Sequence, residues 1–138
     1  MKPKGQQLST YLEWESGAGV ALISLVAVLD ACQSTCTNER SSALLSDSDQ
    51  LRAASRDFQT WLHDQPCPDP DINLRVARVS RSVAYLATSF EVLARSALTV
   101  SWGVAERELT GLRVMVTGTY SMMSGRSTPR RRRTGAGG

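Results

Sequence analysis

The chain has 138 residues, of which 41% are hydrophobic and 6% aromatic, and its formal net charge at pH 7 is +3. That length predicts one domain with a single hydrophobic core and terminal tails. Three cysteines are too few, and odd in number, for a secreted disulfide scaffold. We therefore expect a cytoplasmic protein with reduced thiols.

The positive charge is concentrated at the C-terminus. Arginines stand at 126 and 130–133, and no acidic residue follows residue 125. Residues 1–125 carry 11 basic and 13 acidic side chains, a net charge of −2. We expect a disordered N-terminus at 1–7, a near-neutral helical domain at 8–124 and a disordered, Arg-rich tail at 125–138.

The first predicted helix covers residues 8–36. Its segment Ser16–Leu29 has no charged residue and is apolar in nearly every direction, which is typical of a helix buried in the middle of a fold. Those residues span about 21 Å as a helix, less than the roughly 30 Å hydrocarbon core of a bilayer. Glu15 and Asp30 border the segment, so composition disfavours a membrane span.

An exported lipoprotein is an alternative interpretation of the same region. Lys2 and Lys4 resemble the charged start of a signal peptide, and Leu29-Asp30-Ala31-Cys32 resembles a degraded lipoprotein cleavage box. Asp30 occupies a position that takes a small uncharged residue, and Glu13 and Glu15 make the flank acidic. The alternative is a membrane-tethered protein processed at Cys32.

A second helix is predicted at 46–65. Ser46, Asp47 or Ser48 can cap its start through a side-chain oxygen. Its apolar stripe ends before Pro66. Asp69 is then the expected N-cap of the next helix, with Pro70 at the first helical position.

The longest pattern runs from Ile72 to Val104, where apolar residues alternate at steps of four and three. It predicts a third helix at 70–101 whose stripe is covered by other helices. The positions flanking this stripe are almost all small or hydroxyl-bearing, for example Ser80, Ala87 and Ser89. A dimeric coiled coil usually has charges there, so we expect a bundle within one chain.

A fourth helix is expected at about 104–123, although the β-branched residues of 112–120 leave a strand as the alternative. Together these segments predict an all-α fold, a single up-and-down bundle of about four helices. The expected core is Leu22, Val26, Leu29, Leu51, Phe58, Leu62, Val79, Val83, Leu86, Phe90 and Leu93.

One set of residues has the composition of a structural zinc site. Cys32 and Cys36 are four residues apart, as are His63 and Cys67. If the second helix folds back along the first, however, His63 lies about 22 Å from the cysteines of the first helix, because each helical residue rises about 1.5 Å. Buried thiols and a surface histidine are the simpler interpretation, so no metal or other cofactor is expected.

No catalytic residues are predicted, since the sequence has neither a phosphate-binding loop nor a nucleophile motif. We expect a non-catalytic interaction or adaptor protein that contacts a protein partner or itself. The alternative is a nucleic-acid-associated accessory protein whose tail neutralises phosphates. The residues expected to do so are Arg126, Arg130, Arg131, Arg132 and Arg133.

Overall fold

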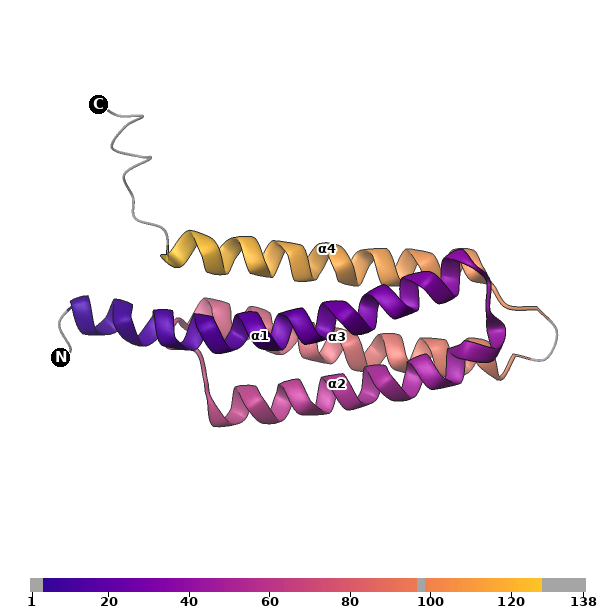
Figure 1. Cartoon of the computed structure of the whole chain (residues 1–138), viewed down its shortest axis with the longest axis horizontal. Helices are drawn as coiled ribbons and strands as arrows, with labels where there is room; N and C mark the ends of the chain where they lie inside the picture. The colour runs from indigo at the N-terminus through magenta and orange to yellow at the C-terminus, as the bar shows by residue number, and fades with distance from the viewer. Residues whose placement is uncertain (1–3, 97–98, 128–138) are drawn as a thin grey trace, which may run out of the picture.

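The computed structural model describes residues 4–96 and 99–127, which form four α-helices and one short 3₁₀-helix (Figure 1). The helices are α1 (Lys4–Thr37), α2 (Leu44–Asp64), α3 (Pro70–Ala94) and α4 (Trp102–Ser127), and η1 (Ser41–Ala43) lies before α2. No strand occurs within these residues. The predicted all-α, up-and-down bundle is confirmed, and the fourth segment is a helix.

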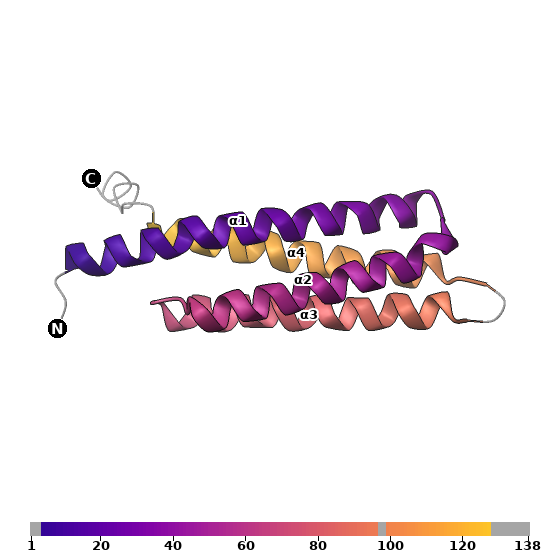
Figure 2. The ribbon, with the colours of Figure 1, turned by 60° about the horizontal axis from the view of Figure 1, so that its bottom comes forward.

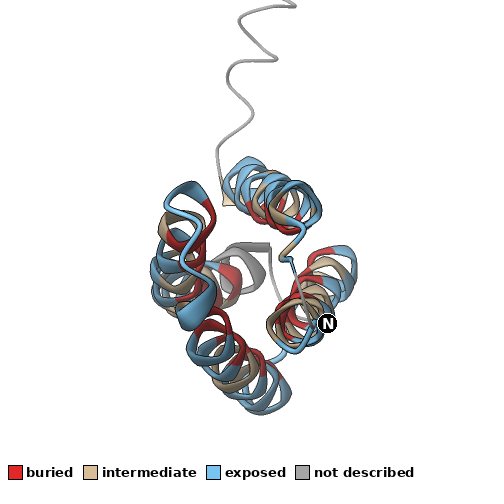
Figure 3. Ribbon diagram, turned by 90° about the vertical axis from the view of Figure 1, so that its right-hand side faces the viewer, coloured by how far each residue is buried: buried red, intermediate tan, exposed pale blue. Residues whose placement is uncertain are grey.

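Consecutive helices run in opposite directions along the long axis, and each packs against two neighbours. The helix α1 lies beside α4, and α2 beside α3 (Figures 1 and 2), and contacts between α1 and α2 and between α3 and α4 close the four helices into a ring. Buried residues line the inside of the ring of helices, and exposed residues cover its outside (Figure 3). The core therefore runs along the axis of the bundle.

The helices α2 and α3 make the closest pair. Ser55 Oγ donates a hydrogen bond to the Ser80 carbonyl oxygen at 2.9 Å, and Ser80 Oγ donates to the Ser55 carbonyl oxygen at 3.1 Å. Two turns along, Ser48 Oγ donates to the Ala87 carbonyl oxygen at 2.7 Å. A side chain this short reaches the opposite backbone only if the two backbones nearly touch. The small residues flanking the stripe of α3 thus do allow a close approach.

The prediction that the third helix extends to residue 101 is wrong, because α3 ends at Ala94. The contacts of Ser48 with Ala87 and of Ser55 with Ser80 fix the register, which places Leu44, the first residue of α2, opposite Glu91. If α3 continued beyond Ala94, its further residues would have no residue of α2 to pack against. The apolar spacing continues to Val104, but its last part belongs to the connection and to α4.

Other boundaries also differ from the expected ones. The helix α4 ends at Ser127 rather than at about residue 123, so residues 125–127, assigned to the tail from the sequence, are helical. The helix α1 begins at Lys4 rather than at residue 8. The proposed caps Ser46, Asp47 and Ser48 are wrong, because α2 begins at Leu44 and these residues lie inside it. The capping role of Asp69 is confirmed: its side chain accepts hydrogen bonds from the N–H groups of Asp71 and Ile72, and Pro70 follows it.

Most of the predicted core is buried. Leu22, Leu29, Leu51, Phe58, Leu62, Val79, Val83, Leu86 and Phe90 are buried, whereas Val26 and Leu93 are only partly buried. The expectation that the first helix is buried all round is also wrong on one side. Val20 is 67% exposed and Ile23 is 64% exposed. Like the other three helices, α1 lies on the ring around the core, so one of its faces points outward.

Candidate functional site

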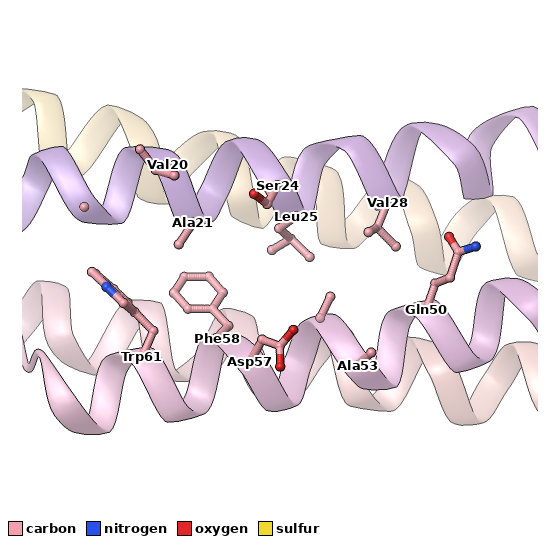
Figure 4. A pocket seen from close by; sticks show the side chains of 12 residues that line it. Val20, Ala21, Ser24, Leu25, Val28, Gln50, Ala53, Asp57, Phe58 and Trp61 are labelled. Carbon is pink, nitrogen blue, oxygen red and sulfur yellow. The ribbon is translucent and has the colours of Figure 1, made fainter.

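An apolar groove of about 690 Å³ lies between α1 and α2 (Figure 4). We call it the α1/α2 groove. Leu25 from α1 and Phe58 from α2 are buried at its base, and Trp61 closes one end. Its lining residues are Gly17, Val20, Ala21, Ser24, Leu25, Val28, Gln50, Ala53, Ala54, Asp57, Phe58 and Trp61.

The side chains on the two walls explain why space remains. Gly17 and Ala21 on α1 lie opposite the rings of Trp61 and Phe58 on α2, and Ala53 lies further along, opposite Leu25 and Val28 (Figure 4). The glycine and the alanines of the two walls have too few side-chain atoms to fill the space between the helices. The rings of Phe58 and Trp61, whose centroids are 5.9 Å apart, stand between the two helices at one end. The helices are thus held apart by aromatic rings beside a stretch of small residues.

The outward face of α1 continues this groove. Val20 lines the groove and is itself mostly exposed, and Ile23 lies further round the same helix. From Ser16 to Leu29 the helix has no charged residue. By length and composition, Thr10–Thr37 is the one described helical segment that could cross a membrane, although a third of its most apolar stretch is buried inside the bundle. The result is a broad uncharged surface on one side of the protein.

A second hollow, of about 530 Å³, adjoins the groove at the end where α2 stops, and we call it the tryptophan hollow. The centroids of the Trp14 and Trp61 rings are 5.6 Å apart. Trp14 Nε1 donates a hydrogen bond to the carbonyl oxygen of Gln65 at 2.7 Å, which fixes its indole ring against the connection to α3. The lining residues are Thr10, Glu13, Trp14, Gly17, Trp61, Asp64, Gln65, Pro66 and Pro68.

The absence of a side chain at Gly17 permits the close approach of Trp61. A Cβ atom at position 17 would lie 3.2 Å from the Trp61 ring atom Cζ2, closer than an ordinary van der Waals contact. The ring of Trp61 therefore lies directly against the backbone of α1. Because Gly17 and Trp61 line both cavities, the groove and the tryptophan hollow share one boundary.

The residues considered as zinc ligands are divided between the two ends of the bundle. Cys32 and Cys36 lie near the end of α1, beside the start of α2, whereas His63 and Cys67 lie at the far end of α2. The side chain of His63 is 90% exposed. Among the described residues, no group of three or more His, Cys, Asp or Glu side chains could hold a metal ion.

The three thiols are buried and free. Burial, assisted by the nearby charge of Asp47, raises the pKa of Cys32 to about 12. Burial is also the main cause that raises the pKa values of Cys36 and Cys67 to about 11. Because the thiolate is the reactive form of cysteine, these thiols are protonated packing groups at neutral pH.

A buried carboxyl lies beside Cys32 and Cys36. Asp47 on α2 is only 6% exposed, and its Oδ2 has no hydrogen-bond partner. Burial raises the pKa of Asp47, while a hydrogen bond from Thr35 and the charge of Arg40 act in the opposite direction. This group affects stability through its charge, as discussed below.

The arginines considered for nucleic-acid contact fall into two groups. Arg126, in the last turn of α4, donates through Nε to Asp69 Oδ2 at 2.7 Å, and its Nη2 lies 3.9 Å from Asp71 Oδ2. Burial opposes ionisation of Asp69, but the hydrogen bonds from Arg126 and from the N–H of Ile72 outweigh it and lower the pKa of Asp69. Arg130, Arg131, Arg132 and Arg133 lie outside the described residues.

No known protein family, curated protein or solved structure matches this chain. Neither the groove nor the tryptophan hollow was predicted from the sequence. The available signals were Gly17 and the alanines of the two helices and the two tryptophans, but which of these residues lie opposite one another becomes evident only once the two helices are paired.

Proposed function

We propose that this protein is a non-catalytic interaction protein that binds an α-helix of a partner in the α1/α2 groove. The observation that carries the proposal is the groove itself, with its apolar base and the uncharged outward face of α1 beside it. Amphipathic helices bind in this manner, by placing an apolar stripe in a hydrophobic groove between helices.

The dimensions of the groove fit a short helix. Along α1 it extends from Gly17 to Val28, and along α2 from Gln50 to Trp61. Each wall is about 16 Å long at 1.5 Å per residue, or about three helical turns. Ser24, Gln50 and Asp57 supply polar groups beside the apolar base. An interface with an apolar centre and a polar edge is the usual arrangement for specific contacts between proteins.

A pair of lysine substitutions tests the proposal. Val20→Lys places a charge at the groove, whereas Tyr85→Lys changes an equally exposed apolar residue, 70% exposed, that lines a different hollow between α3 and α4. The measurement is the amount of each partner that co-purifies from the native host with the parent and with each variant. We expect a partner that is lost with Val20→Lys and retained with Tyr85→Lys. Equal recovery with both variants would contradict the proposal.

The structure gives less support to the two alternative functions. The guanidinium of Arg126 is engaged by Asp69 and Asp71, which reduces the charge available for a phosphate backbone. Cleavage before Cys32 would remove six buried core residues of α1, namely Tyr11, Trp14, Ala18, Leu22, Leu25 and Leu29. A protein whose core requires the whole of α1 fits better with α1 retained than with α1 removed as a signal peptide.

A further inference from the structure

We infer that the tryptophan hollow is a binding site for an arginine side chain, and that its occupant is the protein's own C-terminal segment, Arg130–Arg133. The inference is independent of the helix-binding function proposed above. It rests on three observations: the chemistry of the hollow, the place where α4 ends, and the distribution of charge.

The hollow combines the two kinds of group that a guanidinium prefers. Trp61, which is partly exposed, supplies an indole ring on which a guanidinium can stack through cation–π attraction, and the buried Trp14 packs against that ring. Glu13 and Asp64 supply exposed carboxylates, which accept paired hydrogen bonds from arginine. Glu13 forms no ion pair with any described residue. A planar cation therefore matches the hollow better than an aliphatic or anionic group.

The last helix ends at the same end of the bundle as this hollow. Tyr11 on α1 donates through its hydroxyl to the Met123 carbonyl oxygen at 2.9 Å, and Ser127 Oγ donates to Glu15 Oε2 at 3.1 Å. Arg126 is held by Asp69, in the same connection that contributes Pro66 and Pro68 to the hollow. The chain thus leaves α4 at the end of the bundle that carries the two tryptophans.

The arginines are within reach. Arg130 is three residues beyond Ser127 and Arg133 is six beyond it, which correspond to about 10 Å and about 20 Å of extended chain. A helix with its side chains is about 10 Å across. A segment that starts against Glu15 on one side of α1 can therefore reach Glu13 and the tryptophans on its other side.

The charges of the two parts are complementary. Five carboxylates lie at this end of the bundle, at Glu13, Glu15, Asp64, Asp69 and Asp71, while the segment after Ser127 carries four arginines and no acidic residue. Arg126 already pairs with two of these carboxylates. The contact that we infer repeats this pairing with the next arginines along the chain.

The three indole N–H resonances in a ¹⁵N–¹H spectrum of the full-length protein test the inference. Trp14 and Trp61 lie in the hollow, whereas Trp102 begins α4 at the other end of the bundle and serves as an internal control. In a variant with Arg130–Arg133 all changed to Gln, we expect the resonances of Trp14 and Trp61 to shift and that of Trp102 to stay. Superposable spectra of parent and variant would overturn the inference.

Two further variants separate arginine recognition from general attraction of charge. In the variant with Arg130–Arg133 all changed to Lys, the charge remains but the planar group is lost, so we expect the Trp14 and Trp61 resonances to shift part of the way. If the lysine variant is indistinguishable from the parent, the site does not select arginine. The paired change Glu13→Gln and Asp64→Asn should reproduce the glutamine spectrum.

Proteolysis provides a second readout that does not depend on tryptophan. Trypsin should remove the tail more slowly from the parent than from the Glu13→Gln, Asp64→Asn variant, as followed by intact mass. Asp49→Asn, an exposed acid at the start of α2, is the matched control and should leave the rate unchanged. Equal rates in all three proteins would overturn the inference. Spectra that change with protein concentration would show docking between copies and overturn docking within one chain.

Discussion

The two sides of α2 differ although both contain small residues. Toward α3, Ser48 and Ser55 donate hydrogen bonds to backbone carbonyl oxygens of the opposite helix, and the backbones nearly touch. Toward α1, Ala53 and Ala54 face an open groove. Small residues therefore permit a close approach without enforcing it. Hydroxyl groups that bond across the interface close one side, and aromatic rings that act as spacers keep the other side open.

The largest expected effect comes from placing a charge in the hydrophobic core of the bundle. Leu86→Asp should abolish the cooperative thermal transition, because an unpaired buried carboxylate costs several kcal/mol, much of the stability of a small domain. Thermal melting followed by circular dichroism measures the effect. The matched control is Tyr85→Asp, one position away and largely exposed. If Leu86→Asp melts like the parent, Leu86 does not belong to the core.

The same substitution, Ala to Leu, compares the closed α2/α3 interface with the open α1/α2 groove. Ala87→Leu should lower the free energy of unfolding by about 1–3 kcal/mol, because Ala87 is fully buried where α3 meets α2. Ala53→Leu should change it by less than about 0.5 kcal/mol, since the groove has room for the larger side chain. Urea denaturation measures both values. Equal costs would show that the two interfaces are packed alike.

The serine hydrogen bonds test what closes the α2/α3 interface. Ser55→Ala and Ser80→Ala should each cost about 1 kcal/mol, the usual net contribution of a hydrogen bond. Because the two hydroxyls lie together, the double variant should differ from the sum of the single variants by about 0.5 kcal/mol or more. Strict additivity in a double-mutant cycle would mean that the two bonds act separately.

The smallest effect concerns Asp47, where α1 and α2 do meet closely. Its pKa is raised in the folded state by burial, so the unfolded state binds fewer protons between the unfolded and folded pKa values. The contribution of protonated Asp47 to the free energy of unfolding is therefore complete at a pH below the pKa of Asp47 in the unfolded chain. It is lost as the pH rises through the pKa of Asp47 in the folded protein. Asp47→Asn should therefore stabilise the protein at pH 7, by about 1 kcal/mol or less, and should remove this pH dependence. If the stability of the parent does not fall as the pH rises from the unfolded to the folded pKa of Asp47, burial does not raise that pKa.

The sequence predicts the fold well because the fold depends on patterns within single helices. The stripe from Ile72 to Phe90 and the Asp69-Pro70 start each follow from neighbouring residues. The end of α3 at Ala94 could not be predicted, since the apolar spacing continues beyond it. That end depends on where α2 begins, and thus on the register between two helices.

The groove and the tryptophan hollow could not be predicted, because they too depend on how two helices are paired. Trp14 and Trp61 are 47 positions apart, and nothing within either helix indicates that their rings meet. Gly17 appears in the sequence only as one small residue of an apolar segment. Its importance depends on the indole ring that lies against it. Sites formed between helices thus require the pairing of the helices, which a single sequence does not specify.

The contacts between α1 and α4 have a consequence for synthesis of the protein. Tyr11 and Met123, whose hydroxyl and carbonyl groups are hydrogen-bonded, are 112 positions apart in the chain. Of the four helices, α1 is therefore synthesised first and α4 last. Until α4 has been synthesised, the face of α1 that packs against it stays uncovered, and exposed apolar surface makes a nascent chain prone to aggregation. Folding of the bundle is consequently completed only after α4 has left the ribosome.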